Sequence, residues 1–254
     1  MTPPVVLTIA AHDPLGGAGI AADLTTFAAH GAHGLVAVTA VTAQRFGSVD
    51  RVVATPAELL AAQLDGIVAS FPIDGVKVGL LFDAAQVEVV AERVADGRLP
   101  APVVDPVMVD GRGNRFVDPA IEVAARELLF PRAAALTPNR AEAALLGPDH
   151  AALAALGAGL VVVTGGGASA TDLLVWPDGS IRELVGEWID TTNVRGSGCT
   201  FAAAMTAGLA AGEALETAAT SAKAFVAERL RDGADWTFAA APVVGPVSHR
   251  RAGG

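Results

Sequence analysis

Short apolar runs alternate with amphipathic segments along the chain. Residues 5–10 are mostly apolar and β-branched, which predicts a buried strand. A turn dense in glycine follows at 12–19. From 20 to 28, apolar residues recur at the spacing of one helical face, and Gly31 can end that helix. A second strand is predicted at 35–41.

The same alternation continues toward the end of the chain. Thr55 and Pro56 predict the start of a helix, with Thr55 as the N-cap and Pro56 as the first helical residue. Further helices are predicted at 83–95, after Asp118-Pro119 and after Gly196-Ser197-Gly198. Strands are predicted at 75–81, 102–105, 133–137 and 160–164, and at 173–176 and 181–184, which flank a hairpin turn at 177–180.

Alternating strands and helices predict a mostly parallel sheet with helices on both faces. The composition agrees, because 52% hydrophobic and 17% charged residues supply a large core and suit strands buried on both faces. No linker, low-complexity stretch or repeat divides the chain. We therefore expect one three-layer α/β/α domain over residues 1–254. In such sheets, ligands bind at the carboxyl ends of the strands.

The charge balance narrows the range of partners. The formal net charge is −10, and the one dense basic cluster is His249-Arg250-Arg251. We therefore expect neither nucleic acid nor a membrane as a partner, whereas a nucleotide can still bind locally. Cys199 is the single cysteine, which excludes an internal disulfide. Without a signal-peptide pattern or a long apolar run, a cytoplasmic protein is the simplest interpretation.

Two early segments offer polar groups to a ligand. The glycines of 12–19 permit a close approach of the backbone, although a tight strand-to-helix turn explains them equally well. Asp23 is either a solvated charge or a group that holds a substrate. Gln44 is expected to follow a strand directly, and its amide matches the ring nitrogen and amine of an aminopyrimidine. A lone glutamine is nevertheless more often a surface residue.

Two carboxylates are candidate metal ligands. Asp105 ends a buried apolar strand and precedes Pro106, where a carboxylate is costly unless it is paired or binds a metal. Magnesium is usually held by one or two carboxylates together with waters and phosphates, a role that suits Asp105 and Glu142. For Glu142 alone, a charge that faces the dipole at a helix start is the simpler explanation.

Small residues at 193–200 lead into a helix N-terminus, whose free N–H groups form an anion site. Cys199 lies at that terminus. There the helix dipole lowers the pKa of a thiol, so a thiolate is expected to be able to accept a proton from a hydroxyl group. The alternative is that Cys199 is a small buried apolar residue.

Taken together, these loops resemble one protein family. Matching segments occur in order over nearly the whole chain, and the ending 245–249 also fits. The most specific are Gly16-Gly17-Ala18-Gly19-Ile20, Ala43-Gln44, Lys77-Val78-Gly79, Asp105-Pro106-Val107-Met108, Thr137-Pro138-Asn139 with Glu142, and Gly196-Ser197-Gly198-Cys199-Thr200. In this combination the chain resembles the hydroxymethylpyrimidine/phosphomethylpyrimidine kinases of thiamine biosynthesis, in the ribokinase superfamily.

The resemblance implies a ribokinase-like fold and an activity. That activity is phosphorylation of 4-amino-5-hydroxymethyl-2-methylpyrimidine and of its monophosphate, with ATP and Mg²⁺; relatives are often homodimers. The roles implied for catalysis fall on Cys199 with Gly196, Ser197 and Gly198, and those for the metal on Asp105 and Glu142. The resemblance assigns substrate binding to Asp23, Gln44, Val107, Ala11 and Leu80, and ATP or phosphate binding to Asn139, Thr164, Gly166 and Arg195.

Several positions depart from the family pattern. Ala11 and Leu80 stand where Gly and Met are usual. The segment 164–168 lacks a Lys and a His that the family places near the nucleotide, 110–114 replaces a Lys-Ser-Gly-Asp-type loop, and Arg195 replaces a His. Because fixed cations stabilise the charge of phosphoryl transfer, we expect these changes to affect the rate, above all of the second phosphorylation.

Two other functions stay open at this point. A pyridoxal-type kinase would use the same fold, but pyridoxal lacks the amine beside a ring nitrogen that Gln44 would bind. A non-catalytic pyrimidine-binding protein would fit the missing Lys and His.

Overall fold

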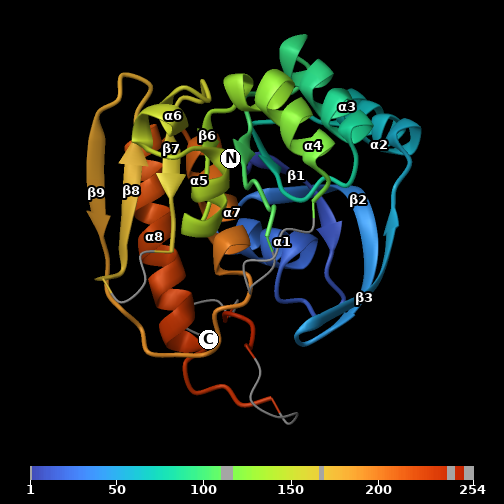
Figure 1. Ribbon diagram of the computed structural model, residues 1–254. Helices are drawn as coiled ribbons and strands as arrows, with labels where there is room; N and C mark the ends of the chain where they lie inside the picture. Colours follow the sequence, from blue (N-terminus) through green and yellow to red (C-terminus); the bar gives the residue numbers. More distant parts are fainter. Residues whose placement is uncertain (1, 110–116, 166–168, 239–243, 249–254) are drawn as a thin grey trace.

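Nine strands form one sheet in the order β3-β2-β1-β4-β5-β6-β7-β8-β9 (Figure 1). The computed structural model describes residues 2–109, 117–165, 169–238 and 244–248. Six neighbouring strands pair in parallel: β2 His33–Arg45, β1 Val5–His12, β4 Gly75–Val78, β5 Val103–Val104, β6 Ala135–Leu136 and β7 Val161–Val163. Three more join through antiparallel pairs: β3 Ser48–Ala54, β8 Thr171–Val175 and β9 Ile181–Val185.

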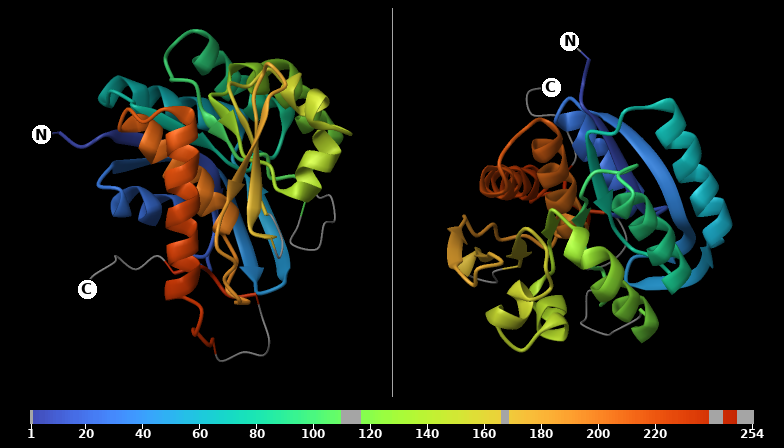
Figure 2. Two further views of the ribbon diagram at one scale, coloured as in Figure 1. Left: turned by 90° about the vertical axis from the view of Figure 1, so that its left-hand side faces the viewer. Right: turned by 90° about the horizontal axis from the view of Figure 1, so that it is seen from above.

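Helices cover both faces of the sheet (Figure 2). One face carries α1 Gly19–Ala29, α7 Ser197–Ala210 and α8 Leu215–Asp232. The other carries α2 Ala57–Ser70, α3 Ala84–Ala95 and α4 Pro119–Ala124, which continues into a π turn at Ala125–Leu129 and a 3₁₀ turn at Phe130–Arg132. Two short helices follow β6: α5 Arg140–Leu146 and α6 His150–Ala154. Among the described residues, no helix combines the length and the apolar character that a bilayer crossing requires.

The apolar core lies on both sides of the sheet, as β7 shows. Val161 and Val163 pack into the cluster that includes Leu64 of α2, whereas Val162 packs with Phe201 and Met205 of α7. A strand buried on both faces needs apolar residues at consecutive positions, which explains the unbroken runs of the sequence. The predicted three-layer α/β/α arrangement with a mostly parallel sheet is confirmed.

The predicted elements are present, with changed boundaries. The helix at 83–95 and the hairpin at 173–184 are confirmed, and the Asp83 side chain accepts the Gln86 N–H at 2.7 Å as an N-cap. The strands predicted at 75–81, 102–105 and 133–137 are shorter in the structure. Their last residues leave the ladder and form the loops at the carboxyl edge of the sheet.

Two local predictions are wrong. Pro56, and not Thr55, is the N-cap of α2, which begins at Ala57. Backbone hydrogen bonding keeps Thr55 extended, since its N–H donates to the Thr39 carbonyl at 2.8 Å. Gln44 does not follow a strand but lies within β2, which continues to Arg45 and pairs with β3. Strand β3 exposes most of its side chains, so it lacks the apolar run that marks a buried strand.

A matched pair of leucines in α2 tests the predicted core. Leu64 is fully buried, whereas Leu59 is 53% exposed. We expect Leu64→Ala to lower the free energy of unfolding by about 2–5 kcal/mol, because the substitution leaves a cavity in the core. Leu59→Ala should change it by less than about 0.5 kcal/mol. Urea unfolding measures both, and equal losses would contradict this assignment of the buried face.

Candidate active site

A buried ion pair lies at the centre of the candidate site. Both carboxylate oxygens of Asp23 accept hydrogen bonds from Lys77 Nζ, at 2.7 and 2.8 Å, and Thr8 Oγ1 donates to one of them at 2.6 Å. All three side chains are fully buried. Burial alone would lower the pKa of Lys77, but attraction to Asp23, Cys199 and Asp105 raises this pKa above its ordinary value. Lys77 therefore remains a cation.

Asp105 lies beside this pair, at the end of β5. Its backbone N–H donates to the Val78 carbonyl at 2.8 Å, which fixes it to the end of β4, and its carboxylate accepts a hydrogen bond from the Cys199 thiol. Burial raises the pKa of Asp105; the Lys77 charge opposes this rise and the Asp23 charge adds to it. Residues from β4, β5, α1 and α7 thus meet in one cluster.

The thiol of Cys199 is protonated in this arrangement. Burial raises its pKa to about 12; Lys77 opposes the rise, while the negative charges of Asp105 and Asp23 increase it. The expectation that the helix N-terminus lowers this pKa is therefore wrong, because burial and two carboxylates outweigh the helix dipole. By surface area the whole Cys199 residue is only partly buried.

Two glycine loops approach each other at this edge of the sheet. Gly196, the N-cap of α7, has a φ of +83°, and a Cβ there would lie 1.7 Å from the Gly17 carbonyl oxygen. Gly19 has a φ of +53°, and its Cβ would lie 2.3 Å from the Ala11 carbonyl oxygen. Among the described residues, no side chain caps α7, and a Cβ on Gly198 would meet no atom within 4 Å apart from those of its own helix backbone and chain neighbours. The first amides of α7 therefore have no side-chain acceptor within the part of the chain that the structure describes, and such amides can bind an anion.

A closed network of hydrogen bonds joins three distant residues. Gln44 Nε2 donates to Asp13 Oδ1 at 2.6 Å, and Arg195 Nη2 donates to both Asp13 Oδ2 and Gln44 Oε1 at 3.0 Å. The backbone of Arg195 pairs with the tail, since its N–H donates to the Gly245 carbonyl at 2.9 Å and its carbonyl accepts the Val247 N–H at 3.1 Å. Gln44 is therefore held at the candidate site and is not a free surface residue.

Glu142 fulfils the structural role that the sequence left open. One carboxylate oxygen accepts the Asn139 N–H at 3.0 Å and the Asn139 side chain accepts the Glu142 N–H, which forms a capping box at α5. Its other oxygen accepts the Met108 N–H at 3.1 Å. Burial and the nearby Asp105 charge raise the pKa of Glu142 to about 7, although these backbone N–H groups oppose the rise.

The residues assigned to ATP or phosphate fall in two places. Asn139 and Thr164 form a bridge between the ends of β6 and β7, and the Thr164 N–H donates to the Pro138 carbonyl at 2.8 Å. Arg195 instead lies with Gln44 and Asp13. Gly166 and the loop 110–114 lie outside the described residues. No group of three or more His, Cys, Asp or Glu within the described ranges is arranged to hold a metal ion.

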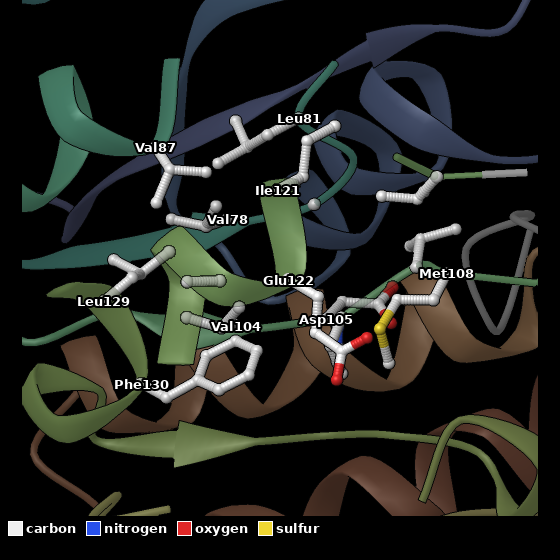
Figure 3. A pocket seen from close by; sticks show the side chains of 15 residues that line it. Val78, Leu81, Val87, Val104, Asp105, Met108, Ile121, Glu122, Leu129 and Phe130 are labelled. Carbon is white, nitrogen blue, oxygen red and sulfur yellow. The ribbon is translucent and has the colours of Figure 1, made fainter. Parts of the chain in front are cut away.

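The remaining predicted substrate residues lie around the same edge. Ala11 is buried where the pairing of β1 with β2 shifts by one residue, and Val107 is partly buried. Leu80 packs on the core, and its carbonyl accepts a hydrogen bond from Thr39 Oγ1 at 2.7 Å. Asp105 and Val107 also border a mainly apolar cavity of about 40 Å³ between the sheet and α3 and α4 (Figure 3). Cys199 and Gln44 do not line this cavity.

Lys77, in a matching motif, and Asp13, in the glycine-dense turn at 12–19, received no role from the sequence. The sequence did indicate a role for Lys77, because a lone charged residue within a buried strand requires a buried counter-charge. No comparable pattern marked Asp13, whose partners are 31 and 182 residues away in the sequence.

The sequence model of the family described as phosphomethylpyrimidine kinase matches residues 13–244. The chain belongs to this family. Within it, the protein is 40% identical over 98% of both chains to the hydroxymethylpyrimidine/phosphomethylpyrimidine kinase of Synechococcus elongatus. It is 36% identical to the pyridoxine kinase of Bacillus subtilis, over 96% of this chain and 94% of that protein.

Solved structures show the same fold. An ADP complex of Bacillus subtilis pyridoxal kinase superposes with a TM-score of 0.88 and 34% identity, over 98% of both chains. The predicted membership of the phosphomethylpyrimidine kinase family and the ribokinase-like fold are thereby confirmed. Relatives named for two different substrates share this fold, so the substrate must be argued from individual side chains.

The contact between the two glycine loops generates a prediction. Gly196→Ala places a Cβ against the Gly17 carbonyl at a positive φ, so we expect a loss of unfolding free energy of about 1–3 kcal/mol or more. Gly198→Ala is the matched control for stability, because its Cβ would lie within a helix and would meet none of the other described residues. Urea unfolding compares them, and a Gly196→Ala protein as stable as the wild type would contradict the close packing.

Proposed function

We propose that the protein transfers the γ-phosphoryl group of ATP to the hydroxymethyl oxygen of 4-amino-5-hydroxymethyl-2-methylpyrimidine, and to the phosphate of the resulting monophosphate, in thiamine biosynthesis. One observation carries the proposal: the start of α7, Cys199 and Asp105 meet at the edge of the sheet where Gln44 is held. Similarity to the Synechococcus elongatus kinase supports it, and the ADP complex of the Bacillus subtilis relative supports ATP as the donor.

The start of α7 stabilises the transferred phosphoryl group. The N–H groups of Gly198 and Cys199 belong to its first turn, and no side chain caps the helix. Such amides carry the positive end of the helix dipole and are oriented before the reaction, so they can stabilise charge without rearrangement. Positioning and electrostatics supply most of the catalysis in phosphoryl transfer, which fits this site.

Cys199 accepts the proton of the attacking hydroxyl group. In the unliganded protein, the thiol donates a hydrogen bond to Asp105 and is protonated at neutral pH. It therefore acts as an acceptor once its own proton has moved to water. Lys77 assists, because its fixed charge favours the thiolate over the thiol.

Magnesium fits Asp105 better than Glu142. Both oxygens of Glu142 already accept backbone N–H groups, whereas the buried Asp105 carboxylate accepts only a thiol among the described residues. One carboxylate with phosphate oxygens and waters is a usual Mg²⁺ environment. The ion would supply positive charge to the phosphates. Asn139 and Thr164, at the ends of β6 and β7, are proposed to contact the nucleotide.

A pyridoxal-type kinase is the second candidate, because the Bacillus subtilis relatives are named for pyridoxine and pyridoxal. Gln44 favours the aminopyrimidine. Its amide has an N–H beside a carbonyl lone pair, which match the ring nitrogen and amine of that substrate once the bonds of this pair to Asp13 and Arg195 open.

A substrate comparison tests the proposed function. With ATP and Mg²⁺, we expect hydroxymethylpyrimidine to gain one phosphate and then a second, detected by mass spectrometry, and kcat/KM to exceed that for pyridoxal. Preference for pyridoxal would favour the second candidate. Binding of the pyrimidine without any phosphate gain would instead identify a non-catalytic binding protein.

Substitution of Cys199 tests the proton transfer. We expect Cys199→Ala to lower kcat by about 10²–10⁴-fold, which is the usual contribution of a general base. The KM for the pyrimidine should change little, and Cys199→Ser should recover part of the rate. Circular dichroism and thermal unfolding control for folding. Near-normal turnover in Cys199→Ala would remove Cys199 from this role.

A further inference from the structure

A short segment near the end of the described chain, residues 245–248, lies beside the entry to α7. It forms a parallel bridge with the residue two positions before that helix. The Arg195 N–H donates to the Gly245 carbonyl at 2.9 Å, and the Val247 N–H donates to the Arg195 carbonyl at 3.1 Å. Most of the segment is buried. It is therefore part of the packed structure that leads into α7.

The segment also contacts α8 and the glycine loop after β1. The Ser248 N–H donates to the Arg229 carbonyl in α8 at 3.2 Å. A Cβ on Gly17 would lie 2.9 Å from Pro246 Cβ, which is closer than packed side chains approach. The carbonyl oxygen of the same Gly17 would lie 1.7 Å from a Cβ on Gly196. The segment and the N-cap of α7 thus both pack on one residue of the turn at 12–19.

Asn193 holds the first residue of the segment in place. Its side-chain N–H groups donate to the Gly233 and Trp236 carbonyls at 2.8 and 2.9 Å, and the residue is 3% exposed. These bonds fix its side-chain oxygen beside Gly245, where a Cβ would lie 1.9 Å from Asn193 Oδ1. A side chain at 245 would therefore have to break the bonds of Asn193 or move the segment.

We propose that residues 245–248 position the start of α7 for phosphoryl transfer and that Gly245 and Pro246 are the positioning residues. This inference rests on the proposed function, because the first amides of α7 can stabilise the transferred phosphoryl group only while they are held in place. The segment acts through Arg195 and Gly17. A displacement of about 1 Å can cost about 100-fold in rate, so these contacts matter even at a distance from the reacting atoms.

Gly245→Ala tests this role in the full chain. We expect its Cβ to displace the segment from Asn193 and kcat for the pyrimidine to fall about 10- to 100-fold. The affinity and the stoichiometry of ADP binding should not change, because the proposed nucleotide contacts, Asn139 and Thr164, lie in a different part of the site. Calorimetric titration with ADP counts the folded sites, so a fraction of unfolded protein cannot produce this result.

Two further variants complete the comparison. Val244→Ala is the matched control, because Val244 precedes the segment and is 56% exposed. It should leave kcat unchanged. Pro246→Gly removes the ring that packs on Gly17 and adds no atom, so we expect kcat to fall by a smaller factor than in Gly245→Ala. This variant decides if Gly245→Ala does not fold.

Hydrogen exchange gives a measurement that does not depend on activity. In Gly245→Ala or Pro246→Gly without ligands, we expect faster exchange in peptides from 12–19 and 193–200, because the segment no longer holds these loops together. Exchange in peptides that contain β7 should stay as in the wild type, since this strand lies in the core.

The outcomes separate the inference from the proposed function. An unchanged kcat in Gly245→Ala or, if that protein does not fold, in Pro246→Gly, overturns the inference. A loss of kcat matched by an equal loss of ADP-binding sites, or an equal loss in Val244→Ala, also overturns it. If the wild type phosphorylates nothing, the proposed function fails and hydrogen exchange judges the inference. Wild-type exchange at 12–19 and 193–200 in the variants would then overturn it, and faster exchange would support it.

Discussion

The ammonium group of Lys77 lies fully buried against both carboxylate oxygens of Asp23, at 2.7 and 2.8 Å. Removing two charges from water costs several kcal/mol for each ion, and only close geometry with further hydrogen bonds offsets that cost. The pair therefore requires α1, which carries Asp23, to stay in register with β4, which carries Lys77. Its charge also acts on Cys199 and Asp105. The same ion pair therefore supports the fold and sets the charge of the site.

Backbone contacts and a network of side-chain hydrogen bonds complete the site around this pair. Gly196 and Gly19 allow their loops to approach other backbone segments more closely than any side chain would permit. This approach brings the start of α7 beside the turn after β1. The hydrogen bonds between Asp13, Gln44 and Arg195 then join the same two loops. In Figure 1, the β2–β3 turn and the segment that enters α7 both lie toward the bottom of the view.

The sequence predicted the layers of the fold because burial on both faces leaves unbroken apolar runs such as 160–164 in β7. It missed β3, which is largely exposed, and α8, whose buried residues are mainly alanines such as Ala218 and Ala222 that give little apolar periodicity. Motifs identified Asp23, Gln44, Asp105 and Cys199 as site residues. Their partners depend on long-range packing, so the sequence could not show that Lys77 pairs with Asp23. The raised pKa of Cys199 was missed for the same reason, because burial and neighbouring carboxylates are properties of the folded chain.

The central claim is that distant loops form one site in which a pyrimidine lies between Gln44 and Cys199. A crystal structure of the protein with hydroxymethylpyrimidine and ADP tests this most directly. The account predicts that the ring nitrogen and amine contact the Gln44 amide while the hydroxymethyl oxygen lies within hydrogen-bond distance of Cys199 Sγ, beside the first amides of α7. A pyrimidine bound elsewhere, or one whose hydroxymethyl group points away from Cys199, would contradict it.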